Sequence, residues 1–483
     1  MSVKVLVIGA GPAGLAAGVR LLEQGQGRVE VKLIHMGHHL GGKAASYRML
    51  DGRFVEHGWH MVVGFYERMR SLMERAGVKD VLRSMGRVSH PYEPATGKIH
   101  SLEAGSNRVA FAARFALAYD GIPARDKGNY ARFFAQAFAE AGSGIDLTRH
   151  DDVCFNTWAV ERGLRPHVTK YSQFRFLREA YFNFPEQISA YHVLQSLKLM
   201  NNAERGELFV LNGSYSEKIW DPVAQYFATL GGEREPYVMA TDFLYQGRRI
   251  TGVKAVKPDG SGHHDGTTSW TTATLPREAG SERVLEGFDH VISTVPHAVF
   301  LTMNADDVAW WSSPYFSRLK NLRSAATISM VIETKQPVLP FEGPVFGFPA
   351  PLGIAVNMTP YWDEVRKRGV GSVIAFVGQE AGFESWTDEQ IAEFTLDNFS
   401  RQPQVGDLRA AGISYLELHR NRSDFERLLL CEPGVNRFRP GPKTPFHNLF
   451  LAGDWVRNDV DLICMEGAIC SGEAAADLVL EQL

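Results

Sequence analysis

The sequence predicts an α/β fold: a doubly wound parallel sheet and a second lobe of α+β character. A β-branched run at 3–8 is followed at once by a glycine-rich turn and an apolar helical pattern. The chain has 483 residues, more than one hydrophobic core usually supports. An aromatic-rich helical stretch at 107–202 precedes a strand-rich stretch at 300–430. The second lobe should therefore contain both a sheet and an aromatic-rich helical region.

The glycine-rich turn predicts a dinucleotide-binding site. The run at 3–8 is typical of a buried parallel strand, and a second strand is expected at 29–34. Between them, Gly9 permits a tight turn, Gly11 lets the backbone approach a pyrophosphate, and Gly14 lets the helix pack on the strand. The helix starts around Pro12 and Ala13, where free N–H groups can bind an anion. A GxGxxG spacing alone is weak evidence, but this strand–turn–helix context strengthens it.

Composition restricts the possible partners. Hydrophobic residues make up 45% and charged residues 22% of the chain, as in ordinary soluble globular proteins. The 51 basic and 55 acidic residues give a net charge of −4, which offers no electrostatic case for nucleic acid. The four cysteines are too few and too scattered for a disulfide framework or a zinc cluster, and this fits a reducing compartment. We expect no metal site, because the pair His263–His264 lacks a third ligand.

A cytoplasmic protein without a membrane-spanning helix is expected. The N-terminus leads straight into the first strand, which leaves no room for a signal peptide. The longest uncharged run, at 343–362, contains four prolines and cannot form one apolar helix. Two interpretations of the aromatic residues at 107–202 stay open. They form the core of a helical region, or some of them line an apolar tunnel or a mouth in peripheral contact with a membrane.

Local patterns predict the other elements. We expect helices at 67–77, 215–230 and 388–399, the last behind a capping box at 387–390. We expect a loop at 84–98, a hairpin at 245–256, a solvated loop at 260–271 and a strand at 288–295 that closes the nucleotide domain. Strands of the second lobe are expected at 325–333, 353–356, 372–377 and 414–419.

Three stretches carry a resemblance to a known family. They read GAGPAGLAAG at the first turn, LGGKAASYRMLDGRFVEHGWHMVVGFY after the second strand, and RFRPGPKTPFHNLFLAGDWVRNDVDLICMEGAICSG at 437–472. They resemble the flavin amine oxidoreductase superfamily, and within it the plant-type phytoene and ζ-carotene desaturases most. The resemblance implies a Rossmann-type FAD-binding domain formed by 1–75, 205–298 and 430–483. It also implies a substrate-binding lobe formed by 76–204 and 299–429.

The resemblance also implies which residues bind FAD. Asp454 matches the residue that meets the ribityl–diphosphate arm, and Met465 matches one whose backbone N–H points at the flavin pyrimidine carbonyl. The helix that begins there would aim its positive end at reduced flavin. Further implied contacts are Gly41, Gly42, Lys43, Gly58, Trp59, His60, Met61, Met239, Ala240, Gly453 and Ala468.

The second strand departs from the family pattern at its end. The family has an acid there that binds the adenosine ribose, whereas this chain has His35. A neutral imidazole can still accept one hydrogen bond, so adenosine binding would be weaker or altered. Alternatively, the loss of the acid beside Lys43, His38 and His39 indicates an NADP-type phosphate. The C-terminal flavin motif favours FAD.

The expected chemistry is hydride abstraction from an allylic C–H bond of an apolar isoprenoid or polyene. Amine oxidases of the superfamily place a cage tyrosine before the Met of the C-terminal motif, but this chain has Cys464. Arg439 and Lys443 match basic positions of the desaturases and would stabilise an anion or contact a quinone. The alternative is that both residues belong to a surface loop and form salt bridges there. His60 has either a catalytic or a structural role. The electron acceptor would be a quinone or oxygen. An isoprenoid isomerase or dehydroxylase, a flavin amine oxidase and a non-catalytic flavin-binding module remain as alternatives.

Overall fold

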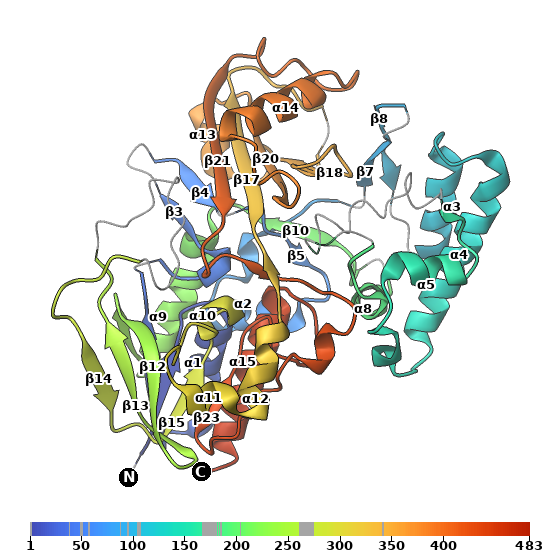
Figure 1. Ribbon diagram of the computed structural model, residues 1–483. Helices are drawn as coiled ribbons and strands as arrows, with labels where there is room; N and C mark the ends of the chain where they lie inside the picture. The colour runs from blue at the N-terminus through green and yellow to red at the C-terminus, as the bar shows by residue number, and fades with distance from the viewer. Residues whose placement is uncertain are drawn as a thin grey trace.

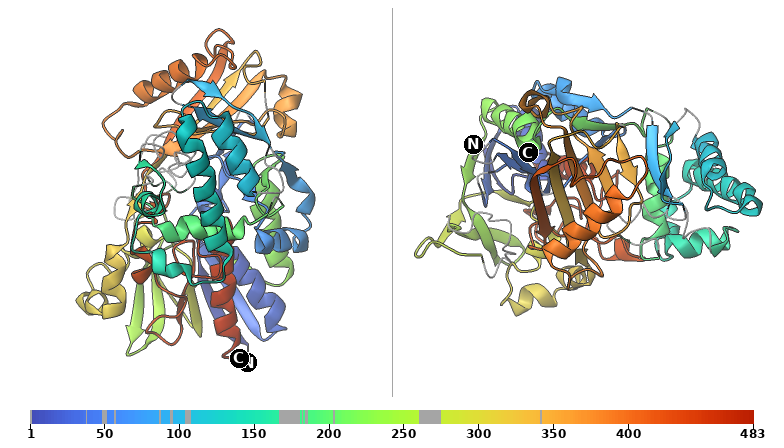
Figure 2. Two further views of the ribbon diagram at one scale, coloured as in Figure 1. Left: turned by 90° about the vertical axis from the view of Figure 1, so that its right-hand side faces the viewer. Right: turned by 90° about the horizontal axis from the view of Figure 1, so that it is seen from above.

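The computed structural model describes residues 2–483 except 38, 49–51, 57, 87, 94–95, 104–107, 167–180, 182, 184–185, 203, 260–274 and 341. A domain with a parallel sheet carries both chain termini at one end, and a second lobe with a larger sheet lies at the opposite end (Figure 1). Four helices extend to one side of these two parts, and the view from above shows the same arrangement (Figure 2): α3 (Arg108–Ala118), α4 (Ala124–Gly142), α5 (Phe155–Glu161) and α8 (Ala190–Leu199).

The parallel sheet confirms the predicted fold class. Its strands are ordered β11 (Glu233–Pro236), β2 (Val29–His35), β1 (Val3–Ile8), β15 (His290–Ser293) and β23 (Leu449–Leu451). Val5, Leu6 and Val7 are fully buried because helices cover the central strand, which explains its unbroken apolar run. The strand expected at 288–295 is present as β15. Strand β15 lies inside the sheet, and β23 forms the edge beyond it.

Helices α1 (Pro12–Gly25) and α15 (Met465–Leu480) pack against each other over this sheet. Their contact is close because Gly472 faces the backbone of α1: a Cβ at Gly472 would lie 2.1 Å from the carbonyl oxygen of Ala13. Helix α2 (Glu67–Arg75) and helix α9 (Asp221–Thr229), which follows a π-helical turn at Ser216–Trp220, complete this layer. The predicted hairpin is confirmed as β12 (Met239–Gln246) and β13 (Arg249–Val256), with β14 (Arg283–Glu286) beside them.

The second lobe is built on an eight-stranded sheet. Its path is β21 (Ile413–Asn421), β17 (Thr327–Thr334), β20 (Ser372–Gln379), β19 (Ile354–Asn357), β18 (Pro344–Phe346), β7 (Val88–Glu93) and β8 (Lys98–Ile99), and β9 (Leu102–Glu103) also pairs with β7. Helix α14 (Asp388–Ser400) packs on it, and its capping box is confirmed: Thr387 and Gln390 bond each other's backbone N–H. Helix α13 (Asp363–Arg368) lies nearby.

The predicted loop at 84–98 is wrong. Residues Val88–Glu93 form β7, which pairs in parallel with β18 and antiparallel with β8 and β9. This segment contains Pro91 and does not alternate between apolar and polar residues, so its sequence did not indicate a strand. Its main partner comes from residues some 250 positions away, so pairing rather than local propensity determines its conformation.

The helical region comprises α3 (Arg108–Ala118), α4 (Ala124–Gly142), α5 (Phe155–Glu161) and α8 (Ala190–Leu199). Tyr130, Phe133, Phe155 and Trp158 are at most 2% exposed; the last three rings pack on one another, and Tyr130 packs on Phe134. These rings therefore form a core, as the first of the two interpretations has it. Phe174, Phe176 and Phe182 lie outside the described residues, as does the pair His263–His264.

Short elements complete the described chain. The strands are β3 (Ser46–Arg48), β4 (Phe54–Glu56), β5 (Val62–Val63), β6 (Leu82–Ser84), β10 (Leu208–Leu211), β16 (Ser324–Ala325) and β22 (Leu428–Leu429). The helices are α10 (His297–Phe300), α11 (Val308–Ser312) and α12 (Pro314–Ser317), with 3-10 turns at Gly42–Ala44, Lys79–Val81, Leu147–His150, Arg318–Asn321 and Val435–Arg437.

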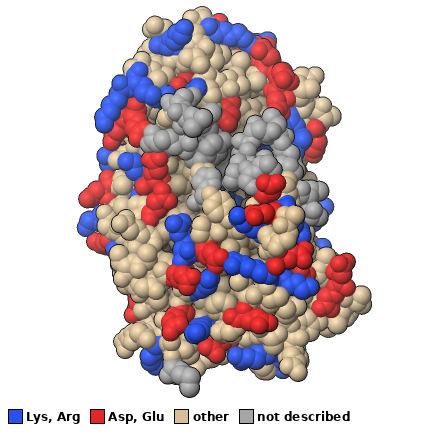
Figure 3. All heavy atoms as spheres, turned by 90° about the vertical axis from the view of Figure 1, so that its left-hand side faces the viewer, with Lys and Arg blue, Asp and Glu red and all other residues tan. Residues whose placement is uncertain are grey.

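Three further observations concern partners and metal ions. Among the helices that the structure describes, none is both long and apolar enough to cross a bilayer. On the face shown in Figure 3, acidic and basic side chains are interspersed rather than gathered by sign. In the described part of the chain, no three His, Cys, Asp or Glu residues are arranged to hold a metal ion.

Candidate functional site

A cavity of about 580 Å³ lies between the nucleotide domain and the second lobe. The nucleotide domain contributes the carboxyl ends of β1, β2 and β15, where ligands bind in open parallel sheets. The second lobe contributes Thr327, Ile354 and Val377. Most residues predicted from the sequence line this cavity: Gly9, Gly11, Pro12, Ala13, His35, Gly42, Lys43, Gly58, Trp59, His60, Met61, Met239, Ala240, Gly453, Asp454, Met465 and Ala468.

Two predicted glycines shape the site from behind its wall. A Cβ at Gly14 would lie 1.9 Å from the carbonyl oxygen of Gly9, so only glycine allows α1 to approach the turn. Gly41 has a φ of +108°, and its Cβ would lie 2.2 Å from the Trp220 ring. Neither residue lines the cavity, and both give the two glycine-rich turns their shape.

Gly11 has the opposite role. Its backbone is extended, and a Cβ there would meet no atom closer than the Gly42 Cα at 3.8 Å. A side chain at position 11 would therefore fill the cavity instead of disturbing the protein around it. The bare backbone leaves a cradle of the kind that a pyrophosphate occupies.

Two helix N-termini meet at this cavity. Helix α1 has Gly11 as its N-cap, without a capping side chain or an acidic residue in its first turn. Helix α15 begins at Met465, and the acid in its first turn, Glu466, is turned to α2, where it accepts the N–H groups of Arg68 and Met69. Burial raises the pKa of Glu466 to about 7. The positive ends of both helices thus face the cavity, as anionic groups of a dinucleotide and a reduced flavin require.

Lys43 and Asp454 form an ion pair across the cavity wall. The Lys43 Nζ lies 2.9 Å from the Asp454 Oδ2, and both side chains are at most 20% exposed. The pair joins the second glycine-rich turn to the C-terminal motif, 411 residues apart. Because Lys43 is engaged by Asp454, it does not support the alternative of an NADP-type phosphate. His38 lies outside the described residues, and His39 lines the cavity.

His35 ends strand β2 and lines the cavity with only 5% of its surface exposed. The family resemblance places His35 beside the adenosine ribose of FAD; on that placement we predict that His35→Glu tightens FAD binding by on the order of 1 kcal/mol, because a carboxylate accepts a stronger hydrogen bond from the ribose. FAD retained after dialysis measures the effect. His35→Gln supplies an uncharged acceptor as the control. Equal or weaker retention by the Glu variant would show that the imidazole already serves the ribose or lies away from it.

A buried acid that the sequence reasoning missed lies just before the loop Gly58–Met61. Glu56 ends β4 beside a small cavity of about 20 Å³, which Gly58 and Trp59 also line. Burial raises the pKa of its carboxyl to about 8, against the effect of a hydrogen bond from the Tyr215 backbone N–H. His60 packs on the Tyr215 ring, with the ring centroids 5.5 Å apart. The acid two residues before Gly58 was the available indication, but its burial depends on the second lobe.

Glu56→Gln should stabilise the fold at alkaline pH. The folded carboxyl keeps its proton to about pH 8, whereas the unfolded one loses it near 4.5, so stability falls as pH rises between these values. The amide does not ionise and so avoids this loss of stability. The pKa difference between the folded and unfolded carboxyl corresponds to a loss of a few kcal/mol. Urea unfolding at pH 5, 7 and 8.5 should show a gain that grows with pH. A gain of equal size at all three values would contradict the raised pKa.

Cys464 is the N-cap of α15, and its Sγ accepts the N–H of Gly467 at 3.4 Å. Tyr66, the N-cap of α2, hydrogen-bonds to the same sulfur, and both residues line the cavity. Burial raises the pKa of Cys464 to about 12, so the thiol stays neutral. Sequence reasoning missed Tyr66, although it closes the EHGWHMVVGFY stretch.

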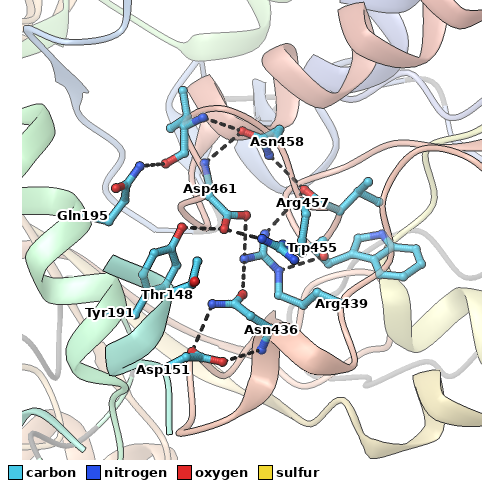
Figure 4. A network of polar contacts seen from close by, with 12 residues as sticks. Thr148, Asp151, Tyr191, Gln195, Asn436, Arg439, Trp455, Arg457, Asn458 and Asp461 are labelled. Carbon is cyan, nitrogen blue, oxygen red and sulfur yellow. Dashed lines mark hydrogen bonds and ion pairs between the residues drawn. The ribbon is translucent and has the colours of Figure 1, made fainter. Parts of the chain in front are cut away.

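Neither Arg439 nor Lys443 lines the cavity, and their role toward an anion or a quinone stays a prediction. Arg439 is 2% exposed, and its guanidinium pairs with Asp461 at 2.9 Å and bonds the Trp455 carbonyl at 3.0 Å (Figure 4). Lys443 is exposed and pairs through its backbone with Phe450 at the sheet edge. The turn at Pro440–Pro442 separates the two residues. The Arg439 side chain is therefore part of a buried structural ion pair, whereas Lys443 lies at the surface.

The Arg439 network joins the helical region to the C-terminal motif. Tyr191 of α8 donates to Asp461 at 2.7 Å, and the Gln195 side chain donates to the Val460 carbonyl at 3.0 Å. Asn436, which accepts a bond from Arg439, donates in turn to Asp151 (Figure 4). Sequence reasoning found none of these partners of Arg439, because they lie on segments that meet only in the fold.

A family model described as flavin containing amine oxidoreductase matches residues 12–480. The chain belongs to this family. A 15-cis-phytoene desaturase of Narcissus pseudonarcissus is 22% identical over 99% of this chain and 79% of its own length. A ζ-carotene desaturase of Synechocystis sp. is 25% identical over 99% of this chain and 97% of its own length. The protein is thus a flavin-dependent oxidoreductase, and the resemblance to the desaturases is confirmed at low identity.

Solved structures share the fold. An oxidoreductase from Methanosarcina mazei aligns with a TM-score of 0.70 at 15% identity, over 98% of this chain and all of the other. A putrescine oxidase bound to putrescine aligns with a TM-score of 0.71 at 15% identity, over 100% of this chain and 99% of the other. At such identities the likeness extends to the fold alone.

Proposed function

We propose that this protein is an FAD-dependent desaturase that abstracts hydride from an allylic C–H bond of an apolar isoprenoid or polyene. The observation that carries this proposal is the wall of the cavity at the start of α15. A neutral thiol, Cys464, stands where amine oxidases of the family have a cage tyrosine. The desaturases that match the chain along nearly all of its length support the same substrate class.

FAD, when bound, supplies the hydride acceptor. The residues of the chain hold and shield it. The cradle at Gly11 and the N-terminus of α1 would receive the pyrophosphate, and Met465 at the start of α15 would face the flavin pyrimidine. Ile354 and Val377 of the second lobe face the same cavity as Trp59 and Met61. This apolar lining would exclude water and orient a hydrocarbon substrate by shape.

The same proposal assigns cofactor binding to one part of the protein and substrate binding to the other. Segments 1–75, 205–298 and 430–483 would bind FAD, and segments 76–204 and 299–429 would bind the substrate. The acceptor that reoxidises the flavin would be a quinone or oxygen. We place the protein in the cytoplasm, with peripheral membrane contact as the route for an apolar substrate; flotation with liposomes tests that contact.

Anaerobic mixing with a linear isoprenoid polyene tests the function. The oxidised flavin absorption should bleach, and deuterium at the allylic carbon should slow the bleaching, because the C–H bond breaks in that step. Simple primary and secondary amines should leave the flavin oxidised. Bleaching by an amine and by no polyene would favour a flavin amine oxidase, for which Tyr66 leaves one aromatic ring at the wall. A product with shifted double bonds and no net bleaching would favour an isomerase.

A further inference from the structure

A turn of the second lobe reaches across the cavity to the nucleotide domain. It connects β21 with β22 and carries Phe425. In Figure 1, strand β21 points from the second lobe toward the nucleotide domain, and this turn follows its end. Phe425 packs against a cluster of the nucleotide domain formed by Met239, Val256 and Leu275. The two parts of the protein therefore touch through apolar side chains at this place.

The contact lies at one end of the large cavity. Phe425, Met36, Met239 and Leu275 all line it. Met36 directly follows His35, the residue at the position expected for the adenosine ribose. Met239 and Ala240 start β12 and are the residues expected beside the adenine. Two thioethers, a leucine and an aromatic ring thus surround the space next to the ribose position, which suits the faces of a planar base.

The turn is held in place by its own hydrogen bonds. The Glu426 and Arg427 N–H groups donate to the Ser423 carbonyl at 3.0 and 3.1 Å. The Glu426 carboxylate also accepts from the Ser423 hydroxyl, and His419 contacts its Oε1 at 3.1 Å. The Arg427 guanidinium donates to the Ser324 carbonyl at 3.1 Å. Phe425 thus stands on a shaped turn and not on a loose loop.

We propose that Phe425 is the second lobe's contact to the adenine of the bound dinucleotide, so that the cofactor joins the two parts of the protein through its adenosine half. This inference rests on the proposed FAD. An aromatic ring against a base adds affinity that does not depend on the flavin ring. The residue therefore contributes to the choice of FAD over FMN, which has the same flavin but no adenosine.

Flavin fluorescence titration of apoprotein with FAD and with FMN tests the proposal. Phe425→Ala should weaken FAD binding about ten- to a hundredfold, the range for loss of one base–aromatic contact, and leave FMN binding unchanged. Phe425→Tyr should keep the wild-type affinity for both. Phe394→Ala is the matched control, since Phe394 is also a half-buried phenylalanine of the second lobe and does not line the cavity.

The comparison of the two flavins separates binding from folding. Unchanged FMN affinity shows that Phe425→Ala has folded, and a loss confined to FAD supports the contact. An equal loss for both flavins, or none for FAD, overturns the proposal. If the wild-type protein prefers FMN to FAD, the proposed cofactor and the Phe425 contact both fail.

Discussion

Gly11→Val should yield a folded but colourless protein. The extended backbone at position 11 suits valine, and the nearest atom to a new Cβ is 3.8 Å away, so the Cβ itself meets no clash. The branched side chain would fill the cradle at the N-terminus of α1, where the pyrophosphate is expected. We expect at least about a hundredfold weaker FAD binding, in line with the loss of a charged group's hydrogen bonds. Absorbance near the flavin band of the purified protein measures it.

Gly128→Val is the control for this experiment. Gly128 is exposed on α4, has no atom near a new Cβ and does not line the cavity. This variant should stay yellow. A yellow Gly11→Val protein with wild-type FAD affinity would show that the pyrophosphate does not pass over Gly11. An unfolded one would contradict the open geometry at that position.

Arg439→Met should lower the free energy of unfolding by about 3–5 kcal/mol, the usual cost of breaking a buried ion pair from one side. Burial acts to raise the pKa of Asp461, but Arg439 and the Tyr191 hydroxyl outweigh it and hold that pKa below its usual value. Without the guanidinium, the buried carboxylate loses its nearest cation at 2.9 Å, while Arg457 remains at 3.9 Å. Urea unfolding followed by circular dichroism measures the change.

The pH dependence gives this prediction a second readout. In Arg439→Met, the pKa of Asp461 in the folded protein should rise. The variant should therefore lose stability relative to the wild type as the pH rises from the unfolded pKa of the carboxyl group to its raised folded pKa. Arg437→Met is the matched control. Its guanidinium is 59% exposed and pairs with Asp152 at the surface, so its loss should cost less than about 1 kcal/mol. Equal costs for the two variants would refute the structural role assigned to Arg439.

The parts of the fold that depend on neighbouring residues could be predicted from the sequence. Strand β1, its glycine turn and α1 are adjacent in the chain, and each glycine has a steric reason that can be stated without a structure. The capping box of α14 is local in the same way. Strand β7 could not be predicted, because its conformation depends on pairing with β18 far along the chain.

In the candidate site, too, the features that local motifs determine could be predicted, and the features that depend on distant contacts could not. Motif residues at both ends of the chain do line one cavity, and the ion pair of Lys43 with Asp454 connects them directly. Arg439 shows what a motif does not contain, namely the direction of a side chain. Glu56, Tyr66 and Phe425 matter through burial or contacts that only the assembled lobes create.

The order of the strands also bears on how the protein acquires its flavin during synthesis. In the parallel sheet, β1 is made first and β23 among the last, and α1 rests on α15, which follows β23. On the ribosome, the glycine turn at 9–14 therefore exists for most of translation without the helix whose N-terminus completes the cavity. A cofactor that contacts both the glycine turn and the start of α15 can therefore be held completely only after residues 465–480 have been made.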